Sequence, residues 1–180
     1  MIDLLTIRQL KAYAWQDGAF MGAYWFAAFL LTLHFPALAL GPFMTLCTPL
    51  FAGWLLSRFR DEALEGRITF RRGLAYSVYT LFNGAFLFAF GIFAYLTLFD
   101  DGLFLTTMLN SFRESIDIFK QMGQDQKQIY DAIDLINSLS PIEMGAIFMA
   151  YYVIASLPLA FIIAFFCKRK QAKTPHNHTT

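Results

Sequence analysis

The sequence is poor in the side chains that form covalent cross-links. Its 180 residues include only two cysteines. Cys47 lies midway along one apolar stretch and Cys167 lies at the end of another. As helical spans, these positions differ in depth by about 15 Å, at a rise of about 1.5 Å per residue. We therefore predict two separate thiols and no disulfide framework.

Metal ligands and catalytic motifs are equally scarce. Of the three histidines, His34 is isolated in an expected turn, and His176 and His178 lie in the last few residues. A metal site needs three or four correctly spaced N, O or S ligands. The sequence also lacks a Gly-rich phosphate loop, a nucleophile elbow and an HExxH helix. We expect no catalytic residue, no cofactor and no metal, and therefore a protein that is not an enzyme.

Charged residues make up only 15% of the chain, and long stretches contain none. No Asp, Glu, Lys or Arg lies within 18–57, 74–99 or 144–167. Ion-coupled transporters usually place ionisable groups inside their membrane spans, so this absence argues against a proton or sodium antiporter. A net charge of +1 without a clustered basic face gives no reason to expect nucleic acid as a partner.

Apolar residues, in contrast, are abundant. They make up 57% of the chain, which has twenty-one phenylalanines. A soluble domain of this size cannot bury so much apolar surface, whereas lipid tolerates it. Four apolar stretches are long enough to cross a bilayer as helices. We predict an all-α polytopic membrane protein with four transmembrane helices, at about 18–35, 37–57, 74–99 and 141–167.

The basic residues lie almost entirely on one side of these spans. Eleven of the fourteen precede the first span, separate the second from the third, or follow the fourth. They are Arg8, Lys11, Arg58, Arg60, Arg67, Arg71, Arg72, Lys168, Arg169, Lys170 and Lys173. Because short cytoplasmic loops collect Lys and Arg, we predict that both termini and the 58–72 loop are cytoplasmic. The expected location is a bacterial inner membrane, with 168–180 as a basic cytoplasmic tail.

Small residues and the N-terminal pattern predict local packing. Gly18-x-x-x-Gly22 in the first span, and Gly84 with Gly91 in the third, are spaced for close helix contacts within the molecule. Residues 1–16 have an amphipathic pattern, and we expect them to lie along the cytoplasmic interface before the first span.

Two prolines predict further local features. Pro49 should bend the second span, with the hydroxyl of Thr45 near the carbonyl that Pro49 leaves unbonded. Ser140-Pro141-Ile142-Glu143 predicts a sharp start of the fourth span, with Ser as N-cap, Pro in the first turn and Glu three residues after the cap.

Residues 102–139 form the one sizeable segment outside the spans. Apolar residues recur there at spacings of 4, 3, 4 and 3, and Gly123 separates them from a second apolar pattern. We predict an amphipathic helical hairpin on the outer face. Its first apolar stripe is a candidate partner face, formed by Leu105, Leu109, Phe112, Ile116 and Phe119.

The other candidate contacts are polar. Asn83 is the candidate intramembrane polar contact, because it lies deep in the third span. The arginines of the 58–72 loop would either contact anionic lipid head groups, at about 1 kcal/mol each, or serve topology alone. These candidate head-group contacts are Arg58, Arg60, Arg67, Arg71 and Arg72. Nearby Asp61, Glu62 and Glu65 are expected to pair with some of them.

Short motifs along the chain follow the pattern of one family. The motifs are Arg60-Asp61-Glu62, Gly66, Ile68-Thr69-Phe70 and Phe99-Asp100. Together they resemble an uncharacterised family, a domain of unknown function, of four-helix inner-membrane proteins from Bacteroidota. Asp100-Asp101 replaces the Asp-Pro usual there, Met122-Gly123 is similar to the break in the family's outer insert, and Arg71-Arg72 departs from the pattern. The resemblance implies four spans and an inner-membrane location, and it implies no activity.

Two classes of function follow from these patterns. The first is a non-enzymatic accessory or scaffold subunit that acts through its outer hairpin or cytoplasmic loop. The alternative is a small oligomeric transporter or lipid-handling protein, suggested by Pro49, Pro158, Asn83 and the aromatic spans. The expected partners are membrane lipids and either a membrane protein or further copies of the chain.

Overall fold

The computed structural model describes residues 4–121 and 126–168, which form helices and no β-strand. The predicted all-α class is therefore confirmed. In chain order the elements are α1 (Leu4–His34), the 3-10 turn η1 (Pro36–Leu38), α2 (Leu40–Leu46), α3 (Thr48–Ala63), α4 (Phe70–Leu98), α5 (Leu103–Gln121), α6 (Gln126–Ser138) and α7 (Pro141–Cys167).

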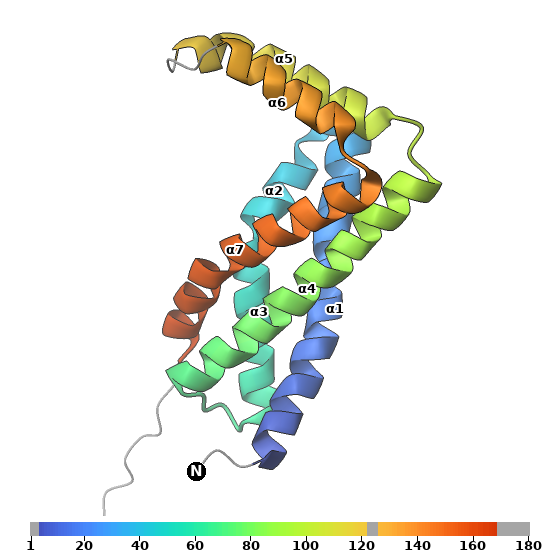
Figure 1. The fold of residues 1–180 in the computed structure, drawn as a ribbon. Helices are drawn as coiled ribbons and strands as arrows, with labels where there is room; N and C mark the ends of the chain where they lie inside the picture. Colours follow the sequence, from blue (N-terminus) through green and yellow to red (C-terminus); the bar gives the residue numbers. More distant parts are fainter. Residues whose placement is uncertain (1–3, 122–125, 169–180) are drawn as a thin grey trace, which may run out of the picture.

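The helices form an elongated bundle with a hairpin across one end (Figure 1). The bundle consists of α1, the successive helices α2 and α3, α4 and α7. The hairpin of α5 and α6 lies at the end where α4 finishes and α7 begins. The start of α1, the α3–α4 connection and the end of α7 lie at the opposite end.

Two helices, α4 and α7, are long and apolar enough to cross a membrane. The pair of α2 and α3, which is bent by 50° at its break, makes a third candidate if it counts as one span. The structure therefore supports two or three membrane-crossing helices by length and composition, where the sequence predicted four. The predicted span that is not among these candidates is α1. Its apolar part is interrupted by Tyr24, Trp25 and Thr32 and is bounded by Asp17 and His34.

The N-terminal segment does not form a separate interfacial helix. From Leu4 onward it belongs to α1, which runs unbroken to His34, and the expected boundary after Gln16 is absent. Leu10 and Ala14 are buried in the bundle core. The apolar pattern that predicted an interfacial helix therefore marks the side of α1 that packs against other helices.

The expected bend near Pro49 is present, but its local geometry differs from the prediction. Pro49 lies in the first turn of α3, where a backbone N–H has no helical partner in any case. The hydroxyl of Thr45 donates to the carbonyl of Gly41, at 3.1 Å, inside α2. The bend thus arises between two helices that meet at Cys47.

The start of α7 is formed as predicted. The backbone N–H of Glu143 donates to Ser140 Oγ at 3.4 Å, and the backbone N–H of Ser140 donates to Glu143 Oε2 at 2.8 Å. This reciprocal capping satisfies two N–H groups that the helix itself leaves without partners.

Glycines bring α1 and α4 into close contact. A Cβ atom added at Gly18 would lie 2.6 Å from Asn83 Cβ and 3.0 Å from the carbonyl oxygen of Thr80. One added at Gly22 would lie 3.0 Å from the carbonyl oxygen of Gly84. The predicted use of these glycines for packing within the molecule is confirmed, and Asn83 is placed on the α1–α4 interface.

The face that α5 packs against the bundle differs from the candidate partner face, which stays a prediction. Phe104 is buried and joins Leu33 and Met144 in a small core, with Met108 packed against it. Leu105, Leu109 and Ile116 are half-buried, and the side chains of Phe112 and Phe119 lie outside the described residues. Periodicity found the helix correctly but could not show which of two neighbouring faces meets the bundle.

We expect Gly18→Ala to lower the free energy of unfolding by about 1–3 kcal/mol, because the added methyl group overpacks the α1–α4 contact. Gly53→Ala is the matched control, because a Cβ there meets nothing within 4 Å. Both variants are measured by denaturant unfolding in detergent micelles. Equal stability of the two variants would contradict the close contact.

Candidate functional sites

The first candidate site is a buried polar cluster at the end of the bundle where α1 begins. Asp17 of α1 has no solvent-exposed area. Arg58 Nη2, from α3, donates to Asp17 Oδ1, and the Tyr76 hydroxyl, from α4, donates to Asp17 Oδ2. Both carboxylate oxygens thus bind side chains of two other helices.

Aromatic rings surround this cluster. The ring of Tyr76 stacks on Phe59, with the ring centres 4.4 Å apart and nearly parallel. The Arg58 guanidinium lies 5.7 Å from the ring centre of Phe20 and 5.5 Å from that of Trp54. A guanidinium between ring faces gains cation–π attraction in addition to its ion pair.

The two charges differ in their access to other partners. The Arg58 side chain is 23% exposed and its Nε lies 3.9 Å from a carboxylate oxygen of Glu62. Asp17, in contrast, is fully enclosed. An unpaired buried charge is costly, and a paired one is retained only with good geometry and further hydrogen bonds. The cluster therefore joins α1, α3 and α4 in one arrangement.

Sequence reasoning missed this cluster because it placed Asp17 just outside the first span. A signal was present, however. Asp17 falls at helical spacing on the stripe of buried residues along α1, formed by Leu10, Ala14, Asp17, Met21, Trp25 and Ala28. The apolar stretches themselves carry no charge, but the bundle buries the carboxylate of Asp17. Missing buried charge therefore does not exclude ion-coupled chemistry in this protein.

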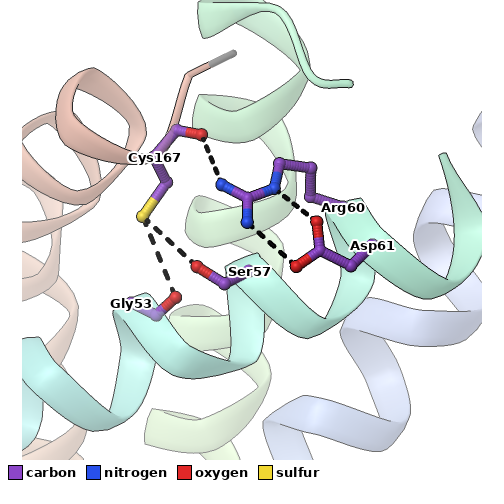
Figure 2. Close-up of polar contacts among 5 residues, drawn as sticks. All are labelled: Gly53, Ser57, Arg60, Asp61 and Cys167. Atoms are coloured by element: carbon purple, nitrogen blue, oxygen red, sulfur yellow. Dashed lines mark hydrogen bonds and ion pairs between the residues drawn. The ribbon is translucent and has the colours of Figure 1, made fainter. Parts of the chain in front are cut away.

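A second polar site lies where α3 meets the end of α7 (Figure 2). Arg60 holds Asp61 through two bonds, Nε to Oδ1 at 2.7 Å and Nη2 to Oδ2 at 2.9 Å. Its Nη1 donates to the carbonyl of Cys167 at 3.3 Å. A positive charge at the carboxyl end of a helix is favourable, because the last carbonyls carry partial negative charge.

The thiol of Cys167 completes this contact. Its Sγ lies 3.8 Å from the hydroxyl of Ser57 and 3.8 Å from the carbonyl oxygen of Gly53 (Figure 2). Gly53, Ser57 and Arg60 lie on one face of α3, whereas Arg58 points toward α1. The end of α3 is thus held on two sides, and Cys47 and Cys167 are both free thiols.

The third candidate site is a pocket of about 340 Å³ at the opposite end, under the hairpin. Its walls come from α1, α2, α4, α5 and α7. Five of the eleven lining residues are aromatic, namely Phe29, Phe88, Phe104, Phe148 and Tyr152. Ligand pockets are typically concave, largely apolar and about 300–1,000 Å³ in volume, so this one lies at the small end of the range.

Among the residues that the structure describes, no group of three His, Cys, Asp or Glu side chains is placed to hold a metal ion. The three candidate sites are an ion-pair cluster, a helix-end contact and an aromatic pocket.

The model of a protein family, described as "Protein of unknown function (DUF4199)", matches residues 16–169. The chain belongs to this family. No curated protein and no solved structure matches the chain. The uncharacterised family expected from the motifs is confirmed, whereas an origin in Bacteroidota stays a prediction. The matched range includes Asp17, Arg58, Tyr76 and Cys167, so the two polar clusters and the pocket all lie within the family domain.

The five candidate head-group arginines of this family member differ in their partners and in their exposure. Arg58 and Arg60 are engaged inside the protein, by Asp17 and by Asp61 with Cys167. Arg67 and Arg71 are exposed, and Arg72 is partly buried. Lipid contact by these last three stays a prediction. Asn83 is half-buried beside Gly18 and forms no hydrogen bond with another residue in the described part of the chain.

In this family member, we expect Arg58→Ala to lower the free energy of unfolding by about 3–5 kcal/mol, because it leaves a buried carboxylate without its ion pair. Asp17→Asn should cost less, because the freed Arg58 is partly exposed and close to Glu62. Unfolding in detergent measures both variants. The control is Arg67→Ala, at an exposed arginine of the same region, and an equal loss in all three would contradict the account.

Proposed function

We propose that the chain is a non-enzymatic integral membrane protein with four membrane-crossing segments, acting as an accessory or scaffold subunit. The observation that carries the membrane assignment is the apolar outer surface of the bundle. Large apolar side chains stand exposed around it on several helices: Phe20, Phe43, Leu46, Leu50, Trp54, Phe86, Phe90, Ile154, Phe161 and Phe166. Soluble monomers rarely expose contiguous apolar surface on this scale.

The fourth crossing in this proposal is α1. It packs along α4, which is itself apolar enough to span, and the glycine contacts fix the two helices together. Its 31 residues extend about 46 Å, at about 1.5 Å per residue, which exceeds the thickness of a hydrocarbon core. The Asp17 charge is neutralised by Arg58, so hydropathy alone understates how well α1 suits the membrane.

The orientation follows from the charges at the two ends of the bundle. Lys11, Arg60, Arg67 and Arg71 lie at the end with the start of α1 and the end of α7. Asp100 and Asp101 precede α5 at the other end, and Asp131 and Asp134 lie in α6. The positive-inside rule places the first end in the cytoplasm of a bacterium, with both termini inside.

The accessory role is supported by the surface of the hairpin. On α6, the large side chains of Tyr130 and Leu135 are exposed. They are next in sequence to the exposed carboxylates of Asp131 and Asp134. Apolar side chains ringed by charge are typical of a protein contact. The contact surface in this proposal is therefore on α6 rather than on the α5 stripe expected from the sequence.

The crossing of α1 is tested by cysteine labelling in bacterial spheroplasts with a membrane-impermeant maleimide. In a background of Cys47→Ala and Cys167→Ala, Leu38→Cys should label in intact spheroplasts, whereas Lys11→Cys should label only after permeabilisation. Both positions are exposed in the structure. Labelling of both from the same side would show that α1 does not cross.

The hairpin contact is tested by cross-linking in native membranes and purification of the tagged chain. We expect a stoichiometric partner protein, or a second copy, that is lost with Leu135→Asp because a charge replaces an exposed apolar contact. Asn137→Asp, at a neighbouring exposed position on α6, adds the same charge and should retain it. Retention by Leu135→Asp, or no product at all, would refute the accessory role.

Lipid handling is a second candidate function, and the pocket under the hairpin favours it. Neither an accessory subunit nor a scaffold requires an aromatic cavity open between its helices.

A further inference from the structure

We propose that the pocket under the hairpin binds one neutral, single-chain amphiphile with a hydroxyl-bearing head, of the monoacylglycerol type. This inference deepens the lipid-handling candidate and rests on the membrane location of the bundle.

The deep part of the pocket is apolar and aromatic. Phe29 lies at the centre of the aromatic cluster. Its ring centre is 5.7 Å from that of Phe104 and 6.4 Å from those of Phe88 and Phe148. Phe88 and Phe104 are buried. Such walls favour an alkyl chain, because its transfer removes apolar surface from water at about 0.8 kcal/mol per buried CH₂ group. A volume of about 340 Å³ suits one chain better than the two chains of a phospholipid.

Hydroxyl groups lie on the more exposed side of the lining. Thr32, Thr45 and Ser111 line the pocket and are exposed, and Thr107 is half-buried. Thr32 Oγ1 donates to the carbonyl of Ala28 at 2.8 Å, and Thr45 Oγ1 donates to that of Gly41 at 3.1 Å. Because the hydroxyl hydrogens of Thr32 and Thr45 are used within their own helices, these two oxygens face a ligand as hydrogen-bond acceptors.

A ligand head that donates hydrogen bonds and carries no charge therefore suits this lining. None of the residues that line the pocket is charged. A carboxylate or phosphate head only accepts hydrogen bonds and would enter without a counter-ion, and an ammonium head would also lack one. An alcohol head satisfies both conditions.

The opening adjoins apolar surface that faces lipid in the proposed topology. Thr45 lies in α2, between the exposed side chains of Phe43 and Leu46. A lipid chain can therefore reach the exposed threonines laterally, without crossing an aqueous layer. Since the hairpin forms one wall, the leaflet concerned is the one at the hairpin end, which is the outer leaflet in the proposed orientation.

The test uses the full chain in nanodiscs and a monoacylglycerol that carries a photoreactive group in its acyl chain. Irradiation should attach the probe to peptides that contain Phe104 or Met108. Thr107→Trp fills the pocket from a lining position and should reduce labelling about tenfold or more. Thr106→Trp places the same ring at the neighbouring exposed position, which does not line the pocket, and should label as the wild type does.

Competition identifies the head group. Unlabelled monooleoylglycerol should displace the probe, whereas oleate and lyso-phosphatidylglycerol with the same chain should not. Equal displacement by the charged lipids would overturn the proposal of a neutral head. Labelling spread over α2 and α3 and unchanged by Thr107→Trp would overturn the pocket itself.

A second measurement separates the binding proposal from folding and from topology. Each tryptophan variant is compared with the wild type in thermal unfolding. Thr32→Val, which keeps the shape of the side chain but removes the acceptor, should weaken monooleoylglycerol binding without loss of stability. Unchanged binding by Thr32→Val would refute the role of the hydroxyls. If the cysteine labelling reverses the orientation, the same pocket would bind from the inner leaflet, so the two failures are distinguishable.

Discussion

The arrangement of the bundle depends on the carboxylate of Asp17. Its two oxygens bind Arg58 of α3 and Tyr76 of α4, so one buried group joins three helices. A buried charge in this position is tolerated only because both carboxylate oxygens accept hydrogen bonds within the protein, one of them from a charged partner. Arg60, two residues after Arg58, binds the end of α7. The last turns of α3 therefore connect all the long helices of the bundle, and the register between these helices is set by polar contacts at one end.

The opposite end of the molecule is held by different forces. There the contacts are mainly aromatic and apolar, centred on Phe29, beside one hydrogen bond between Tyr95 and His34, and a pocket remains between the helices. Between the two ends, Gly18 and Gly22 let α1 approach α4 without intervening side chains. One end is thus fixed by directional bonds, and the other is shaped by packing that leaves space. A ligand bound at the aromatic end would therefore contact helices whose positions are set by the polar contacts at the other end.

The regular features of this fold could be predicted from the sequence because they depend on local patterns. The capping box at Ser140, the hairpin between the third and fourth long apolar stretches and the glycine contacts of Gly18 and Gly22 all follow from short-range rules. The polar cluster could not be predicted in the same way, because Asp17, Arg58 and Tyr76 are far apart in the chain. The side of α5 that meets the bundle could not be predicted either, since Phe104 and Leu105 both fit an apolar stripe and only tertiary contacts distinguish them. The pocket, formed by five helices, has no sequence signal of its own.

The most direct test of this account is a double-mutant cycle between Asp17 and Arg58, read as free energy of unfolding in detergent. The cycle combines Asp17→Asn, Arg58→Gln and the double variant. If the two side chains form the buried pair that positions α3 between α1 and α4, the double variant should be more stable than the sum of the single losses predicts, with a coupling energy above about 1 kcal/mol. Losses that add within about 0.5 kcal/mol would show that the two residues act independently, and the central claim would be wrong.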